Sequence, residues 1–266
     1  MARSASPLAR FARHGGVRPV LLIVSVLVLW ELAVRLFKIP PYLVPAPAQV
    51  IATLIKDWPR LLAESSVTTY ATLGGFALSI VVGIPLAMLI AYSRTFESFV
   101  YPLLVFSQSV PKVAVAPLFV VWFGFGILPK VIVAFLLGVF PIIVSMVTGL
   151  KSVEPEMIDL ARSMRAGRIK TFWWISLPHS LPSLFAGLKV SITLAVVGAV
   201  VGEFVGSNSG IGYVLQIANG NFDLPLMFAA LFVLSMIGVL LFTAIEFAER
   251  WMVPWHSSRR NLLQSA

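Results

Sequence analysis

The sequence predicts an all-α integral membrane protein with six transmembrane helices and both termini in the cytoplasm. Hydrophobic residues make up 59% of the chain, charged residues only 12%, and the mean hydropathy is +0.94. A soluble domain carries about 25% charged residues, so this composition excludes one. The apolar residues also gather in stretches of about 20 residues, the length with which a helix crosses a bilayer.

The Lys and Arg residues indicate the orientation of these helices. With six spans, one side of the membrane receives Arg94, the basic residues between the fourth and fifth spans, and the arginines of both termini. The other side receives only Arg35, Lys38, Lys56, Arg60 and Lys130. Because cytoplasmic loops carry the excess of Lys and Arg, both termini and segment 151–182 are predicted to be cytoplasmic. The net charge of +9 therefore indicates orientation and not binding to nucleic acid.

A basic cytoplasmic tail, residues 1–18, precedes the first predicted transmembrane helix, residues 19–37. This pattern also begins like a secretory signal peptide. However, the nearest small-residue cleavage site, Ala46-Pro47-Ala48, lies far beyond the apolar stretch and among prolines, so we predict a retained helix. Glu31 and Arg35 are one helical turn apart in it and are expected to pair.

Residues 38–66 are predicted to form a periplasmic segment that is proline-rich at first. An amphipathic helix over about residues 47–62 should lie at the interface, because it is too short and too charged to span. Residues 67–247 are predicted to form the core, with five transmembrane helices. Residues 248–266 form a basic and aromatic cytoplasmic tail, which suits an interfacial anchor.

Small residues recur every four positions in the second span, about residues 68–92, and in the fifth, about residues 184–205. A face of small residues lets another helix backbone approach closely. The predicted helix-packing positions are Gly75, Gly83, Gly198, Gly202 and Gly206. We also expect Pro85 to bend the second span.

The third span, about residues 99–123, contains Pro111, Lys112 and Pro117 near its middle. Each proline removes a helix hydrogen bond, and lipid does not tolerate the cation between them, so this part should face protein or a watery pathway. The candidates to line a translocation pathway are Lys112, the two prolines and, in the fifth span, Lys189 and Glu203. The alternatives are structural: Lys112 bonds the carbonyls that the prolines release, and Lys189 and Glu203 pair across helices or reach the surface.

The fourth and sixth spans are predicted over about residues 128–150 and 224–247. The Gly- and Asn-rich segment before the sixth span, residues 206–223, is expected to be a turn or re-entrant loop on the outer side.

The segment between the fourth and fifth spans, residues 151–182, is the longest polar interruption of the core. Acidic residues come first and basic ones follow, which complements a helix macrodipole, and Pro155 suits a first helical turn. Apolar side chains recur at three- and four-residue steps, at Met157, Ile158, Ala161 and Met164. This pattern predicts a short amphipathic helix over about residues 156–165.

This segment resembles the cytoplasmic coupling loop of bacterial ATP-binding-cassette importer permeases. That pattern is Glu-Ala-Ala, three residues, Gly, nine residues, then Ile-x-Leu-Pro. Here Asp159-Leu160-Ala161 stands for its start and Ile175-Ser176-Leu177-Pro178 for its end. Arg165 occupies the position of the Gly, with Gly167 nearby. The stretch PKVAVAPLFVVWFGFG resembles permeases of the nitrate, sulfonate and taurine type, and the resemblance covers nearly the whole chain after about Pro40.

The resemblance implies a transport subunit that works with partners. Two copies of the permease would form the pore, two separate ATPase subunits would hold ATP and Mg²⁺, and a periplasmic or lipid-anchored binding protein would deliver a small nutrient. Nitrate, sulfonates, taurine, bicarbonate and thiamine precursors all stay open as substrates. The residues implied in ATPase coupling are Glu156, Asp159, Ala161, Arg162, Arg165, Gly167, Leu177 and Pro178. For Arg162 and Arg165 the alternative is a role in topology alone.

No motif for catalysis or for a cofactor occurs on the chain. There is no G-x-x-x-x-G-K-[ST] loop, no cysteine, and only three scattered histidines, so we expect no catalytic residue, no metal site and no bound cofactor here. The main alternative is an ion-coupled secondary transporter without an ATPase, although no matching pair of broken segments marks an inverted repeat. An intramembrane enzyme or an assembly scaffold is a further alternative.

Overall fold

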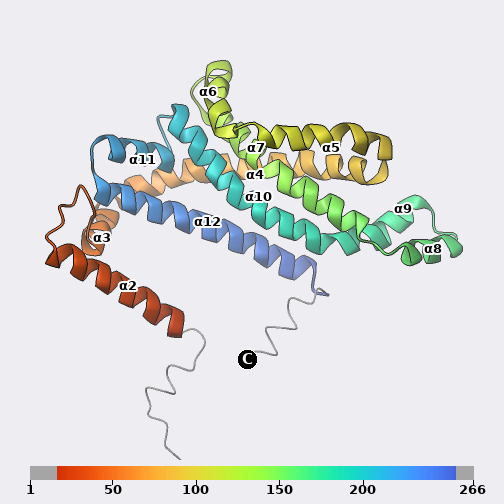
Figure 1. The fold of residues 1–266 in the computed structure, drawn as a ribbon, viewed down its shortest axis with the longest axis horizontal. Helices are drawn as coiled ribbons and strands as arrows, with labels where there is room; N and C mark the ends of the chain where they lie inside the picture. Colours follow the sequence, from red (N-terminus) through yellow and green to blue (C-terminus); the bar gives the residue numbers. More distant parts are fainter. Residues whose placement is uncertain (1–16, 256–266) are drawn as a thin grey trace, which may run out of the picture. The chain divides into compact units, whose positions relative to one another are not determined.

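In the computed structural model the chain is helical almost throughout (Figure 1). Residues 17–255 are described, with side chains from residue 20 on. Within this range 86% of the residues are helical and no strand occurs, so the all-α prediction is confirmed. The elements are α2 (Val17–Leu36), α3 (Pro47–Lys56), α4 (Trp58–Tyr92), α5 (Arg94–Ser109), α6 (Lys112–Phe123), α7 (Ile127–Lys151), α8 (Pro155–Ser163), α9 (Arg168–Thr171), the π-helix η1 (Phe172–Ser176), α10 (Leu177–Gly206), α11 (Ile211–Gly220) and α12 (Leu224–Met252).

Four helical stretches among the described residues are long and apolar enough to cross a membrane: α4, α7, the continuous run Arg168–Gly206, and α12. The bent pair of α5 and α6 makes a fifth if it counts as one span. The predicted first span, residues 19–37, coincides with helix α2. The predicted tails, residues 1–18 and 248–266, lie largely outside the described residues.

Helix α4 begins earlier than the sequence predicted. The expected interfacial helix over residues 47–62 ends at Lys56 as α3, and α4 starts at Trp58 and continues through Pro85 to Tyr92. At 35 residues, α4 is about 52 Å long, which exceeds the about 30 Å of a hydrocarbon core. One end of α4 therefore has to extend beyond the apolar layer.

The predicted third span is not one helix. Helices α5 and α6 meet at an angle of 93°. The break falls at Val110 and Pro111, both in extended conformation, because proline lacks a backbone donor and disfavours the helical conformation in the residue before it. Pro102 and Pro117 lie inside α5 and α6 without ending them. Of the prolines expected to disrupt this span, Pro111 alone causes the break.

Two other elements differ from a simple span-and-loop pattern. The helix that contains the predicted fifth span begins well before residue 184, because it runs unbroken from Arg168 through Pro182 to Gly206. The segment over residues 206–223, expected to be a turn or re-entrant loop, contains a ten-residue helix, α11, which the sequence analysis did not predict.

Backbone contacts divide the described chain into two compact units, residues 17–61 with 214–232, and residues 62–213 with 233–255. In the first unit, Arg35 forms the predicted salt bridge with Glu31, at 2.5 Å. The second Glu31 carboxylate oxygen accepts a hydrogen bond from the backbone N–H of Ala48, at 3.0 Å, and so ties α3 to α2. The rings of Trp30 and Phe228 lie 5.7 Å apart.

In the second unit, α7 lies against both α4 and α10, and glycines form the contacts on both sides. Gly75 of α4 and Gly198 of α10 each approach the backbone around Ala134. Gly83 contacts Ile142, Gly202 contacts the Cα of Lys130, and Gly206 contacts Val120 of α6. A side chain at Gly198 would place its Cβ 2.6 Å from the Cα of Ala134, closer than any real contact. The core of this unit is mostly aliphatic and includes Ile142, Ile143, Met146, Leu184, Phe185 and Ile192.

We expect Gly198→Ala to lower the thermal stability of the purified protein, because the new methyl group meets backbone atoms of α7 that cannot rotate away. Overpacking of this kind costs about 1–3 kcal/mol. The matched control is Gly238→Ala in α12, where a Cβ meets nothing within 4 Å. There the change should be neutral or stabilising, since Ala favours a helix by up to about 1 kcal/mol over Gly. Equal melting temperatures for the two variants would contradict the packing assignment.

Candidate functional site

The segment between α7 and α10 forms a helix–turn–helix. Glu154 is extended and precedes α8, Pro155 fills the first helical position, and Glu156 lies in the first turn. Asp159 and Arg162 form an exposed salt bridge at 3.1 Å on the helix surface. The charges of α8 therefore lie where its dipole favours them, with acid near the start and base near the end.

Helix α8 ends in a Schellman motif with Arg165 in the left-handed position. The N–H of Arg165 donates to the carbonyl of Arg162, and the N–H of Ala166 donates to the carbonyl of Ala161, both at 2.9 Å. Arg165 has φ +59°. Glycine usually occupies this position because it has no Cβ. This explains why the coupling-loop pattern of importer permeases has Gly where this chain has Arg165.

Four apolar residues of α8, Met157, Leu160, Ala161 and Met164, line one depression but differ in exposure. Ala161 is buried, while Met157, Leu160 and Met164 are 43%, 63% and 75% exposed. These three side chains surround a depression of about 310 Å³, completed by the turn and by Lys170 and Ile175. We call Met157, Leu160 and Met164 the apolar face of α8. It lacks a partner within the described residues.

The end of the segment passes directly into α10. Gly167 precedes α9, the π-helix η1 follows, and Leu177 and Pro178 form the first positions of α10. Trp173 and Trp174 in η1 are 60% and 81% exposed. Arg168–Gly206 is one continuous helical run of 39 residues, so α9 and α10 are joined without a loop.

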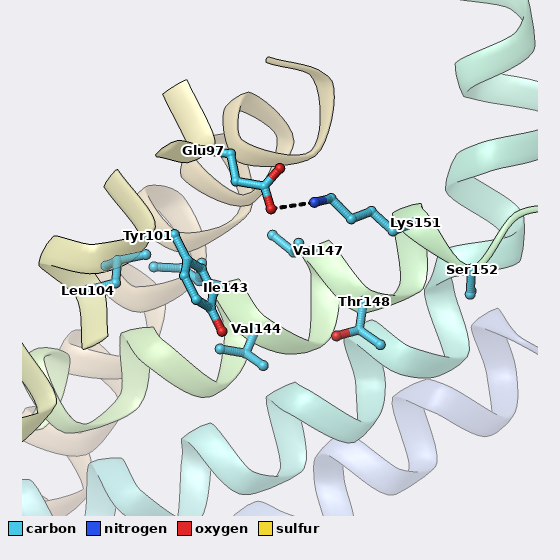
Figure 2. Close-up of a pocket in the computed structure, with 9 residues that line it drawn as sticks. All are labelled: Glu97, Tyr101, Leu104, Ile143, Val144, Val147, Thr148, Lys151 and Ser152. Carbon is cyan, nitrogen blue, oxygen red and sulfur yellow. Dashed lines mark hydrogen bonds and ion pairs between the residues drawn. The ribbon is translucent and has the colours of Figure 1, made fainter. Parts of the chain in front are cut away.

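A salt bridge joins the start of α5 to the end of α7 just before α8. Figure 2 shows the Glu97 carboxylate and the Lys151 ammonium facing each other, at 2.5 Å. Beside them lies a cavity of about 460 Å³, lined by Tyr101, Leu104, Ile143, Val144, Val147, Thr148 and Ser152. The ends of α5 and α7 on the α8 side are thus held together by an ion pair at a mixed polar and apolar hollow.

Glu203 is fully buried near the end of α10 and makes several hydrogen bonds. Its carboxylate accepts from the Thr68 hydroxyl at 2.8 Å and from the backbone N–H of Gly212 at 2.7 Å. The Thr68 oxygen in turn accepts from the N–H of Ile211 at 2.8 Å. Helices α4 and α10 thereby hold the first turn of α11 in place.

Two further charged residues complete this buried cluster. The carboxylate of Glu64 accepts from the N–H of Gly210 at 2.6 Å. Lys130, only 2% exposed, donates to the carbonyl of Ser209 at 2.8 Å, and its charge is attracted to those of Glu203 and Glu64. Gly210 has φ +108°, and a Cβ there would overlap the Glu203 carboxylate. We call Glu64, Thr68, Lys130 and Glu203, with the backbone of 209–212, the carboxylate cluster.

The structure separates the expected pathway residues. Glu203 belongs to the carboxylate cluster, and Lys189 forms a salt bridge with Glu249 of α12 instead of with Glu203, its ammonium also lying 6.0 Å from the centre of the Phe242 ring. Lys112 lies at the break between α5 and α6 and donates to the side-chain oxygen of Gln108. Among the described residues, the Lys112 ammonium forms no hydrogen bond with the backbone carbonyls near Pro111 and Pro117.

Comparisons with known proteins agree with this architecture. The family described as binding-protein-dependent transport system inner membrane component matches residues 79–256. The chain belongs to this family. It is thus a multi-pass membrane protein and the permease subunit of an ATP-binding-cassette importer, which confirms the resemblance found in the coupling segment.

Relatives of the permease align over most of their length. The formylaminopyrimidine transport permease protein ThiX of Halalkalibacterium halodurans is 41% identical, covering 92% of this chain and 98% of its own. The riboflavin transport system permease protein RibX of Chloroflexus aurantiacus is 37% identical, with 87% of each chain covered. The taurine transport system permease protein TauC of Escherichia coli is 28% identical, with 86% of each covered.

A solved structure shares the fold. An inward-facing conformation of the MetNI methionine ABC transporter matches with a TM-score of 0.61 and 21% identity, covering 72% of this chain and 95% of that one. At this identity the match shows the fold alone.

Sequence reasoning missed most of the carboxylate cluster and the Glu97–Lys151 pair. The charge count used Lys130 only to assign a side of the membrane and gave no sign that its side chain is buried. The one local sign of the cluster was the pair of glycines in Gly210-Ile211-Gly212. A side chain at either glycine would overlap Glu203. Glu64 and Thr68 lie more than 130 residues from their partners, so no local pattern could join them.

Arg165→Gly is expected to stabilise the turn after α8 in the permease. A residue other than Gly in the left-handed region raises the free energy of the turn by about 1–2 kcal/mol. Glycine removes this strain, but its greater flexibility stabilises the open state of the turn. The net stabilisation by Arg165→Gly is therefore about 1 kcal/mol. Hydrogen exchange at the turn N–H groups of Arg165 and Ala166 should slow on the order of fivefold. Arg165→Ala is the control that removes the charge but keeps the strain, and it should exchange as the unmodified protein does. Slowing in both variants would mean that the charge, and not the backbone, matters.

Proposed function

We propose that this permease forms the pore as a pair of identical copies and is driven by two separate ATPase subunits that contact α8. The observation that carries this proposal is the apolar face of α8, exposed on an otherwise charged helix in the segment that resembles the coupling loop. Exposed apolar side chains with a charged rim are typical of protein contact sites. The coupling residues would be those that the resemblance implied, with Met157, Leu160 and Met164 added and Ala161 supporting the helix from inside.

The proposed mechanism uses α10 as a lever. Closure of the ATPase subunits on ATP would displace α8 and α9. The continuous run Arg168–Gly206, about 58 Å long, would carry that displacement across the membrane to the carboxylate cluster. ATP and Mg²⁺ would be held by the partner chains, and this chain would bind neither. Binding energy in the ATPase would thereby shift the permease between inward-open and outward-open states.

We further propose six spans with both termini in the cytoplasm. Helix α2 would be the first span, α4 the second and the bent pair α5–α6 the third. The exposed side chains of α2 from Val20 to Leu29 are almost all aliphatic, as a lipid-facing helix requires. The excess of Lys and Arg in the α8 segment supports a cytoplasmic location for it.

The substrate we propose is a small nutrient of the thiamine-precursor type, delivered by a periplasmic or lipid-anchored binding protein. Relatives named for the heterocycles formylaminopyrimidine and riboflavin are 41% and 37% identical. Those named for aliphatic sulfonates and taurine are 27% and 28% identical. The difference favours a nitrogen heterocycle over a sulfonate, nitrate or bicarbonate.

Co-purification tests the partner assignment. The tagged permease is solubilised in mild detergent from its native cells and the accompanying proteins are identified by mass spectrometry. We expect an ATPase subunit in about equal amount. Recovery of the permease alone, under conditions that keep a known importer intact, would contradict the proposal and favour an ion-coupled transporter.

A further inference from the structure

Lys112 differs from the other lysines at comparable positions in the helices because no carboxylate pairs with it. Lys151 and Lys189 form salt bridges with Glu97 and Glu249, and Lys130 lies in the field of Glu203. No salt bridge of Lys112 occurs within the described residues, where its ammonium donates to the neutral side-chain oxygen of Gln108. An amide orients the ammonium but leaves its charge uncompensated.

The position of Lys112 makes this charge costly. Lys112 is partly buried and borders a cavity of about 230 Å³ at the break between α5 and α6, which Leu104, Gln108, Val115, Val139 and Phe140 also line. Val139 is the midpoint of α7, a helix long and apolar enough to span the membrane. The cavity therefore lies near mid-membrane depth, where an unpaired cation requires water, a counter-ion or a polar ligand.

The lining of this cavity combines one polar side with apolar walls. Ser107, Gln108 and Lys112 supply a hydroxyl, an amide and an ammonium, while aliphatic residues and Phe140 line the rest. A few polar groups that fix orientation within apolar walls are typical of small-molecule sites. Since drug-sized ligands occupy about 300–1,000 Å³, this cavity suits a smaller molecule.

We propose that this cavity is a binding station on the translocation pathway, where Lys112 and Gln108 hold the acceptor-rich edge of a small polar solute. The ligand class is a small molecule with a negative charge or with carbonyl or ring-nitrogen acceptors, whose remaining surface contacts the apolar walls. The inference rests on the proposed function and adds the site within the membrane. The 93° break at Pro111 matters because it places the Lys112 side chain beside the middle of α7.

Cysteine labelling tests the site directly, because the chain has no cysteine of its own. Val115→Cys places a thiol on the cavity wall of the full-length permease in nanodiscs. Its reaction rates with the anionic reagent MTSES and the cationic reagent MTSET are compared. We expect MTSES to react faster, and Lys112→Gln to lower the MTSES/MTSET ratio on the order of tenfold or more, because the Lys112 charge attracts the anionic reagent and repels the cationic one. Lys112→Arg keeps the charge and should keep the ratio.

Protection by a ligand supplies the second measurement. Ethanesulfonate and 4-aminopyrimidine, each in millimolar excess, should slow the reaction of the introduced thiol with the neutral reagent MMTS, and Lys112→Gln should remove this protection. A thiol that reacts with no reagent, a ratio that Lys112→Gln leaves unchanged, or protection that survives it would each overturn the proposal. Labelling needs no ATPase, so a permease that binds an ATPase but fails this test rejects the station alone. One that passes it without an ATPase partner rejects the proposed function alone.

Discussion

Replacing Leu160 and Met164 together by aspartate is expected to abolish uptake while leaving the permease folded in the membrane. Both side chains are largely exposed and belong to the apolar face of α8, so the substitutions disturb no buried contact. A hot-spot residue at the centre of an interface contributes about 2 kcal/mol or more, so if Leu160 and Met164 are two such residues, affinity for the ATPase should fall on the order of a thousandfold. Co-purification of the ATPase and substrate-stimulated ATP hydrolysis in proteoliposomes measure this loss.

The control exchanges the same two residues without changing their character. Leu160→Met with Met164→Leu conserves volume and apolarity and should keep ATPase binding and uptake. Normal uptake by the double aspartate variant would refute the coupling role of α8. A substitution at Ala161, which the sequence pattern also suggests, gives a less clear result, because Ala161 is buried and a charge there would disturb the helix itself.

Glu203→Leu is expected to destabilise the folded permease by about 3–5 kcal/mol, because it breaks a buried, hydrogen-bonded charge cluster and removes a counter-charge of Lys130. The backbone N–H of Gly212 and the hydroxyl of Thr68 also lose their acceptor. The expected observation is a large drop in the melting temperature of the detergent-solubilised protein and in its level in the membrane.

A double variant separates charge pairing from packing. Glu203→Leu with Lys130→Met removes both charges and should be more stable than the sum of the two single variants indicates. Glu246→Leu, which breaks the exposed Glu246–Arg250 pair at the end of α12, is the matched control and should cost only about 0.3–0.5 kcal/mol. Additive effects of Glu203→Leu and Lys130→Met would show that the two residues act independently.

The membrane helices were predictable because their signal is local. A run of about 20 apolar residues has to be a helix in lipid, since each backbone group then finds its partner within the same segment. The ends were less predictable. Helix α4 extends ten residues before its apolar part, because exposed polar residues near its start can continue a helix as well as end it. The break at Pro111 followed a known rule, but its 93° angle depends on packing against α7.

The candidate site shows the same division. The spacing from Asp159 to Pro178 indicated a segment that resembles the coupling loop, and the position of Arg165 in the left-handed turn was marked by the pattern's glycine. The pattern placed Ala161 with Met157 and Met164 on one stripe, and all three line the same depression. It did not show that Ala161 is buried or that Leu160 is exposed beside the methionines. Arg165 and Ile175 line the rest of that depression from the turn and from η1, which a helical wheel does not contain.

By itself the sequence determined the membrane class, the approximate positions of the apolar helices and the segment, residues 151–182, that carries the family resemblance. Each of these depends on composition or on residues within about one helix of each other. Only the tertiary structure decided the partners of these side chains: Glu203 accepts from Thr68, Lys130 donates to Ser209, Lys189 pairs with Glu249 and Lys151 with Glu97. Lys112 donates to the Gln108 amide and pairs with no carboxylate among the described residues. Most of these pairs join residues 50 or more positions apart, and an electrostatic interaction depends on distance in space, which a one-dimensional pattern does not contain.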